Sequence, residues 1–206
     1  MEALRISPKY TSHDWHALNP SIPDHWTRAA GIVRDRLNGR FLRFASNCLR
    51  HEYSGFVVLS IDSLLAETIQ QFKEGITNGR DKSKTMIKRF LEGKRFQPHF
   101  DDTARTSFYT DIRCGLLHQA EAKGMWLIRR NQAALLQKVA GGRGYIIDVK
   151  RFHAGVRGSL NDYLKRISDP AESSLRTNLW KKMDHICSVR TARGALYESD
   201  NKVNGV

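Results

Sequence analysis

Hydrophobic positions recur at helical spacing along most of the chain, most clearly over residues 54–74. One stripe of that segment is apolar and is formed by Val58, Ile61, Leu65, Ile69 and Phe72, with Val57 and Leu64 widening it. The opposite side carries Ser, Gln and Glu residues. An amphipathic segment with so wide an apolar face predicts a helix at the centre of the domain.

Other segments share this period and are bounded by residues that start or stop helices. Asp24 precedes the first, Asp101 or Asp102 can cap the helix that carries residues 108–122, and Asp169 to Glu172 has the pattern of a capping box with proline at the first helical position. The predicted helices cover about 24–38, 40–50, 83–92, 103–122, 150–166 and 170–189. Residues 1–22 have no clear period and are expected to form an extended or loosely packed arm.

Apolar and polar residues alternate over 125–130 and 144–149, with several glycines between these segments. This alternation predicts a small β-hairpin. No change of composition marks a boundary, so we expect one domain over residues 1–206 that is mainly α, a helical bundle with a small appended β-hairpin. Its predicted parts are the arm (1–22), a helical core (24–123), the hairpin (125–149), the C-terminal helices (150–189) and a flexible polar tail (191–206).

The chain is strongly basic, with 34 Lys and Arg against 21 Asp and Glu and a net charge of +13. Such a charge attracts polyanions, namely RNA, DNA or an acidic membrane surface, or it serves solubility alone. The densest basic stretch, residues 80–95, can follow a phosphate backbone or form a solvated helix face. We take Lys84, Lys88 and Arg89 from this stretch, and Arg129 and Arg130 beside the aromatic residues of the hairpin, as RNA-binding candidates.

Few cysteines and no long apolar run favour a reducing, cytoplasmic setting. Cys48, Cys114 and Cys187 are widely spaced, which predicts neither a disulfide framework nor a zinc knuckle. The N-terminal residues lack the apolar run of a signal peptide, and no segment is long enough to span a bilayer, so no membrane association is expected. His13 and His16 lack further ligands, and the sequence contains none of the common nucleotide-binding, zincin or α/β-hydrolase motifs, so no metal or cofactor is expected.

The segment from Phe108 to Gly124 combines a buried face with a chemically rich one. On an α-helical wheel, Phe108 and Ile112 lie on the face that packs inward, while Arg113 and His118 flank an outward face. Leu117, Cys114 and Glu121 lie between them. An apolar residue among polar groups indicates a partner surface, and the simplest partner is a second copy with the two helices antiparallel.

Arginine and histidine together can cleave RNA without a metal ion. Histidine can take the proton of the 2′-hydroxyl, and arginine can hold two phosphate oxygens. The products would carry 2′,3′-cyclic phosphate and 5′-hydroxyl ends, and DNA would not react. Spacing alone also allows Arg113 to pair with Glu121 or to make a surface contact.

The segment FYTDIRCGLLH resembles the HEPN signature, an Arg followed by four to six residues and a His, late in a helix of an all-helical bundle. The match is Arg113 and His118, with Tyr109 before them and Asp62 and Glu67 on the preceding long helix; the resemblance covers roughly residues 54–123. It implies a dimeric, metal-independent endoribonuclease of toxin–antitoxin or antiviral defence systems, with these two residues as the catalytic pair. It also implies a homodimer through the 103–122 helix and an antitoxin or other defence protein as a further partner.

Four supporting residues accompany this pair: Tyr109, Cys114, Glu67 and Asp111. The family often has a polar residue after the Arg, where this chain has Cys114. Glu67 is either solvated or reaches Arg113 or His118, and Asp111 lies beside His118 on the wheel and can hold its ring. Because some members of the family are not catalytic, the alternative is an RNA-binding, nucleotide-binding or protein-interaction dimer. The sequence identifies no partner for the other histidines, including His153.

Overall fold

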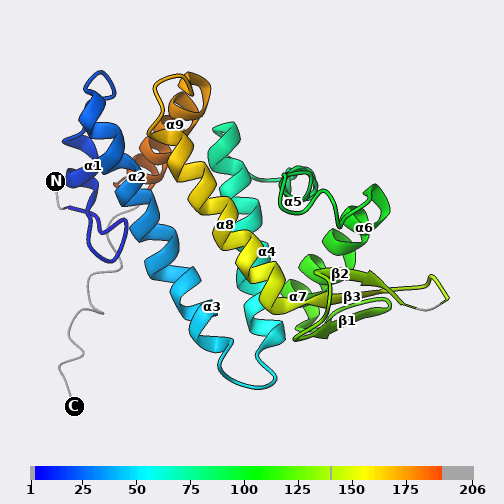
Figure 1. The fold of residues 1–206 in the computed structure, drawn as a ribbon. Coiled ribbons are helices and arrows are strands. Elements are labelled where there is room, and N and C mark those ends of the chain that lie inside the picture. The colour runs from blue at the N-terminus through cyan, green and yellow to red at the C-terminus, as the bar shows by residue number, and fades with distance from the viewer. Residues whose placement is uncertain (1–2, 140, 192–206) are drawn as a thin grey trace, which may run out of the picture.

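The chain is mainly helical, as predicted, with a small β-element at one end (Figure 1). The computed structural model describes residues 3–139 and 141–191, so the predicted tail from 192 onward lies outside the described residues. The helices are α1 (Ser12–His16), α2 (Pro23–Leu37), α3 (Arg43–Cys48), α4 (Gly55–Glu74), α5 (Ser83–Leu91), α6 (Asp102–Ser107), α7 (Cys114–Gln119), α8 (Val149–Ile167) and α9 (Ser173–Thr191). Among the described helices, none combines the length and apolar composition needed to cross a bilayer.

The predicted central helix is confirmed as α4, which packs against α5, α8 and α9. Val58, Leu65, Ile69 and Phe72 of its apolar stripe are fully buried. Leu64, which was expected to widen the stripe, is instead 47% exposed, as is Val57 at 51%. The buried stripe is therefore narrower than the sequence predicts, and one apolar edge of α4 faces outward.

Two π-helical segments change the predicted helix boundaries. The segment η1 (Asn38–Leu42) joins α2 to α3, so Asn38 and Gly39 do not end the first helix. The segment η2 (Phe108–Arg113) joins α6 to α7 in the same way. A π-helical turn bonds residue i to i+5, so it rotates later residues relative to an α-helical wheel.

The N-terminal segment packs closely against the body, in contrast to the expected loose arm. Ile6 and Trp15 are 0% and 1% exposed. The indole nitrogen of Trp15 donates to Asp184 Oδ1 at 2.7 Å, and its ring centroid lies 4.6 Å from that of Trp180 in α9. Single large side chains anchor this segment, which is why it shows no period.

The β-element is a three-stranded sheet rather than the predicted two-stranded hairpin. Strands β1 (Trp126–Arg129) and β3 (Tyr145–Asp148) are the two predicted segments, but they pair in parallel. A third strand, β2 (Leu136–Lys138), pairs antiparallel with β3 and completes the order β1-β3-β2. The hairpin of this sheet is therefore β2–β3, and the strand that was missed is three residues long.

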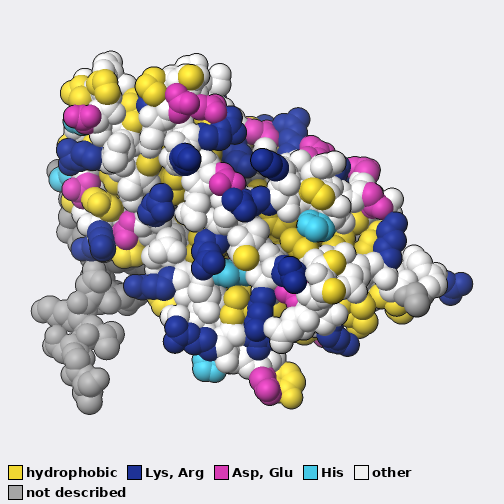
Figure 2. Space-filling view, in the orientation of Figure 1, with side chains coloured by type: hydrophobic (Ala, Val, Ile, Leu, Met, Phe, Trp, Pro, Cys, Tyr) yellow, Lys and Arg dark blue, Asp and Glu magenta, His cyan; other side chains and the backbone are white. Residues whose placement is uncertain are grey.

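Basic residues are spread over the surface of the molecule. Figure 2 shows Lys and Arg side chains distributed over the visible face, with Asp and Glu side chains between them.

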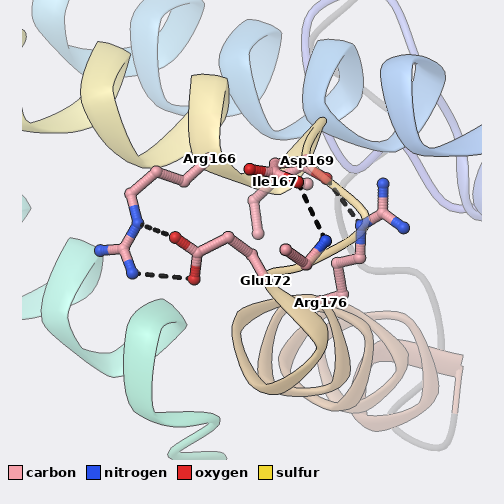
Figure 3. A network of polar contacts seen from close by, with 6 residues as sticks. Arg166, Ile167, Asp169, Glu172 and Arg176 are labelled. Carbon is pink, nitrogen blue, oxygen red and sulfur yellow. Dashed lines mark hydrogen bonds and ion pairs between the residues drawn. The ribbon is translucent and has the colours of Figure 1, made fainter.

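The turn between α8 and α9 differs from the predicted capping box. Helix α9 begins at Ser173, and the carboxylate of Glu172 turns back to the guanidinium of Arg166 on α8, at 2.5 and 2.8 Å (Figure 3). Arg176 donates to the carbonyl oxygen of Ile167 at 2.9 Å. The Asp169–Glu172 segment therefore ties two consecutive helices together, and its glutamate is used across the turn instead of in a cap.

Candidate functional site

The helix that carries the predicted catalytic pair is fixed by its cap and its aromatic residues. Asp101 accepts a hydrogen bond from the backbone N–H of Ala104 at 2.7 Å and so caps α6. Phe108, at the start of η2, is fully buried and packs against Phe100, Phe152 and Trp126. These contacts set the orientation of the residues that follow.

Arg113 turns toward α4 and pairs with Glu67. Its Nη2 lies 3.0 Å from Glu67 Oε2, and the two side chains are 21% and 15% exposed. The sequence allows Glu67 either to be solvated or to reach Arg113 or His118. In the structure it reaches Arg113. The alternative partner Glu121 instead accepts a hydrogen bond from the backbone of Ala122.

Glu67 is the centre of a polar group that we call the rim cluster: Glu67, Gln71, Ser83 and Arg113. Gln71 donates to Glu67 Oε1 at 3.2 Å, and the Ser83 hydroxyl donates to Oε2. Lys182 of α9 extends the cluster by donating to Gln71 Oε1 at 2.9 Å, and burial lowers the pKa of this lysine. The rim cluster therefore joins α4, α5 and η2, and Lys182 links it to α9.

Arg113 and Glu67 stand at the wall of a groove of about 500 Å³ between α4 and α7. Leu64 and Leu117, 47% and 62% exposed, form apolar parts of the same wall. The hydroxyl of Ser63, also in the lining, is buried and has no hydrogen-bond partner among the described residues. The groove thus offers a cation and an exposed apolar edge to a ligand or partner.

His118 lies apart from the rim cluster within one protomer. It is an exposed residue of the last turn of α7 and is not in the lining of the groove. Within the part of the chain that the structure describes, no hydrogen bond or ion pair joins it to Arg113. The helix therefore brings Arg113 to Glu67, and leaves the imidazole on the outside.

Besides Glu67, the supporting residues Asp111, Tyr109 and Cys114 have partners of their own. The carboxylate of Asp111 accepts hydrogen bonds from Ser107 at 2.6 Å and Thr110 at 3.0 Å. The ring of Tyr109 lies 5.9 Å from the guanidinium carbon of Arg113. Burial raises the pKa of Tyr109, and its hydrogen bond with Cys114 acts in the same direction. Asp111 thus braces the start of the helix, and Cys114 pairs with Tyr109.

Most of the proposed RNA-binding residues are engaged in the fold. Lys88 pairs with Asp102 at 2.7 Å, and Arg89 pairs with Glu74 at 2.6 Å. Arg130 donates to the backbone carbonyl oxygen of His51 at 2.9 Å. Lys84 and Arg129 are exposed, so these two are the most accessible to a phosphate backbone.

The structure also contains a polar group that sequence reasoning missed. Ser46, Asp62 and His153, which we call the interior cluster, are joined by hydrogen bonds between α3, α4 and α8. The available signal was local: Asp62 lies one turn from Val58 and from Leu65, on the apolar side of a helix, where an acidic residue needs a buried partner.

No group of three or more His, Cys, Asp or Glu side chains in residues 3–139 and 141–191 is arranged to hold a metal ion. Comparison with protein-family models, curated proteins and solved structures finds no match to this chain. The arrangement of Arg113, Glu67 and His118 is therefore the observation that bears on function.

Proposed function

We propose that this protein is a metal-independent endoribonuclease that uses Arg113 and His118. The observation that carries the proposal is the position of Arg113, whose described ion pair occupies Nη2 alone at the wall of a groove. The rest of a guanidinium held in this way can pair with phosphate oxygens. The net charge of +13 supports a polyanionic substrate.

The chemistry needs no group beyond RNA and these two side chains. His118 takes the proton of a 2′-hydroxyl, the 2′-oxygen attacks the adjacent phosphorus, and the bond from phosphorus to the 5′-oxygen breaks. That oxygen receives the proton that His118 has taken, and the products are 2′,3′-cyclic phosphate and 5′-hydroxyl ends. Arg113 stabilises the charge that develops on the phosphate oxygens. A role as a toxin or defence nuclease with a restraining partner protein follows from the resemblance to HEPN proteins.

A homodimer supplies the histidine that a single protomer does not bring to Arg113. Exposed Leu64 and Leu117 border the groove and offer an apolar contact for a second copy. A two-fold contact between the α6–α7 helices then places His118 of one copy near Arg113 of the other.

The test is cleavage of RNA in EDTA by wild type, Arg113→Ala and His118→Ala, with analysis of product ends. We expect each variant to lose about 100-fold or more of the activity. His16→Ala and Arg143→Ala, both at exposed positions outside the groove, are matched controls that keep it. Mixing the two inactive variants restores part of the activity if the site is shared between protomers, whereas intact RNA with folded wild type contradicts the proposal.

The second candidate is a non-catalytic RNA-binding or nucleotide-binding dimer. It is favoured by the Glu67–Arg113 pair, which neutralises the cation in the free protein. RNA binding that weakens steeply with salt, without any cleaved product, identifies this function.

A further inference from the structure

The interior cluster has the geometry of a relay from a carboxylate through an imidazole to a hydroxyl. His153 Nδ1 lies 2.9 Å from Asp62 Oδ1, and His153 Nε2 lies 2.8 Å from Ser46 Oγ. The three residues come from α4, α8 and α3, so the contact depends on the tertiary fold. An aspartate that holds one ring nitrogen while a serine bonds the other is the arrangement that activates a serine.

Hydrogen-bond chemistry sets the direction of this relay. An ionised Asp62 can only accept, so Nδ1 of a neutral His153 carries the hydrogen and Nε2 accepts from the Ser46 hydroxyl. Burial raises the pKa of Asp62, and the hydrogen bond from His153 acts in the opposite direction. The serine is therefore hydrogen-bonded to the nitrogen that can take its proton.

Accessibility differs along the relay. The side chains of Asp62 and His153 are 0% and 4% exposed, whereas Ser46 is only half-buried. Ser46 is thus the outer residue of the group, while the two residues that orient its hydroxyl are shielded from water. A nucleophile needs this order, because the substrate must reach the oxygen and not the carboxylate.

Cations lie on the two helices that carry Ser46 and His153. Arg43 lies one turn before Ser46 on α3, and Lys150 and Arg157 lie one turn before and after His153 on α8; all three are exposed. Figure 2 shows Lys and Arg side chains spread over the face that α2, α3 and α8 form in Figure 1. Three exposed positive charges on the helices that carry Ser46 and His153 favour an anionic phosphoric ester over a neutral carboxylic ester.

We propose that Ser46, His153 and Asp62 form a second reactive site, independent of the Arg113 groove, in which Ser46 is a nucleophile toward phosphoric diesters. Ser46 Oγ attacks phosphorus, and the bond from phosphorus to one ester oxygen breaks. His153 Nε2 takes the Oγ proton and passes it to the leaving oxygen, so the protein carries a phosphoryl ester on Ser46 and an alcohol is released. Water then attacks phosphorus while His153 Nε2 takes one of its protons, the bond to Oγ breaks, and His153 passes that proton to Ser46 Oγ, which releases a phosphoric monoester. Asp62 is a positioning residue that holds the ring and stabilises the imidazolium.

The first test treats the full-length protein with a fluorophosphonate, which phosphonylates activated serines with loss of fluoride, and maps the adduct by mass spectrometry. We expect one adduct, on Ser46, that is absent in Ser46→Ala and unchanged in Ser174→Ala, a control at an exposed serine of α9. Asp62→Asn, which keeps a hydrogen-bond acceptor but allows the wrong ring tautomer, lowers the rate about 100-fold.

The second test separates the role of the cations in binding an anionic substrate from the reactivity of Ser46 itself. Arg157→Ala lowers hydrolysis of bis(4-nitrophenyl) phosphate, which is anionic, and leaves the rate of fluorophosphonate labelling unchanged. The proposal is overturned if folded wild type shows no adduct on Ser46, or if Asp62→Asn labels as fast as wild type while circular dichroism shows both to be folded. In either case the interior cluster only joins three helices.

Discussion

Two carboxylates of helix α4, Asp62 and Glu67, lie in different surroundings. Asp62 lies in the interior cluster with an exposed fraction of 0%, while Glu67 lies in the rim cluster with 15%. The partner of Asp62 is His153, whose imidazole can be neutral. The partner of Glu67 is Arg113, whose guanidinium is always charged. The difference shows that one helix can bury a polar group for orientation on one side and hold an exchangeable charge at a groove on the other.

The largest expected difference between the two carboxylates is in stability. Asp62→Ala leaves His153 buried without its acceptor, so we expect the free energy of unfolding to fall by about 3 kcal/mol. Glu67→Ala lowers it by only about 1 kcal/mol, because solvent reaches its partners. Urea unfolding of the two variants measures both values, with Asp62→Asn as the control that keeps the acceptor. Equal losses would mean that the two clusters do not differ in the way that their burial indicates.

The reactivity of Cys187, which is buried, and of Cys114, which is half-buried, tests the same contrast between the interior of the protein and its rim. Burial raises the pKa of the Cys187 thiol to about 11, so little of it is thiolate at pH 8. Cys114 is only half-buried beside the rim cluster. We expect iodoacetamide to modify Cys187 about 100-fold more slowly than an ordinary cysteine, from a shift of about two pKa units. Peptide mapping gives the rates, and labelling in urea should remove the difference. Rapid native labelling of Cys187 would contradict the tight packing of α9.

The pH dependence of stability distinguishes the buried carboxyl from its amide. Burial raises the pKa of Asp62 above its unfolded value of 3.8. Folding therefore favours the protonated form, and the stability of wild type relative to Asp62→Asn is highest below that value. It falls as the pH rises through the raised pKa. Denaturant midpoints of both proteins between acidic and neutral pH measure the difference. A difference that grows with pH would indicate that His153 lowers the pKa of Asp62 more than burial raises it.

Particular residues explain how far the sequence predicts the two clusters. The period of α4 identifies the helix and its buried stripe, because a single face packs against the core. The direction of Arg113 was not predictable from a wheel of constant angle, because η2 is π-helical. His153 was assigned no partner, since its contacts with Ser46 and Asp62 join residues 107 and 91 positions apart. The alternation of residues identified β1 and β3, but it does not encode whether strands run parallel.

The smallest expected effect is the coupling between Glu67 and Arg113, and it bears directly on the proposed nuclease. A double-mutant cycle with Glu67→Gln and Arg113→Gln should give a coupling energy of about 0.5–1 kcal/mol that declines with added salt, because both side chains contact solvent. A cation held this weakly can exchange its carboxylate for a phosphate at small cost, while Ser83 and Gln71 keep Glu67 satisfied. A coupling of several kcal/mol would instead make the pair a structural lock, and would favour a site in which Arg113 does not reach RNA.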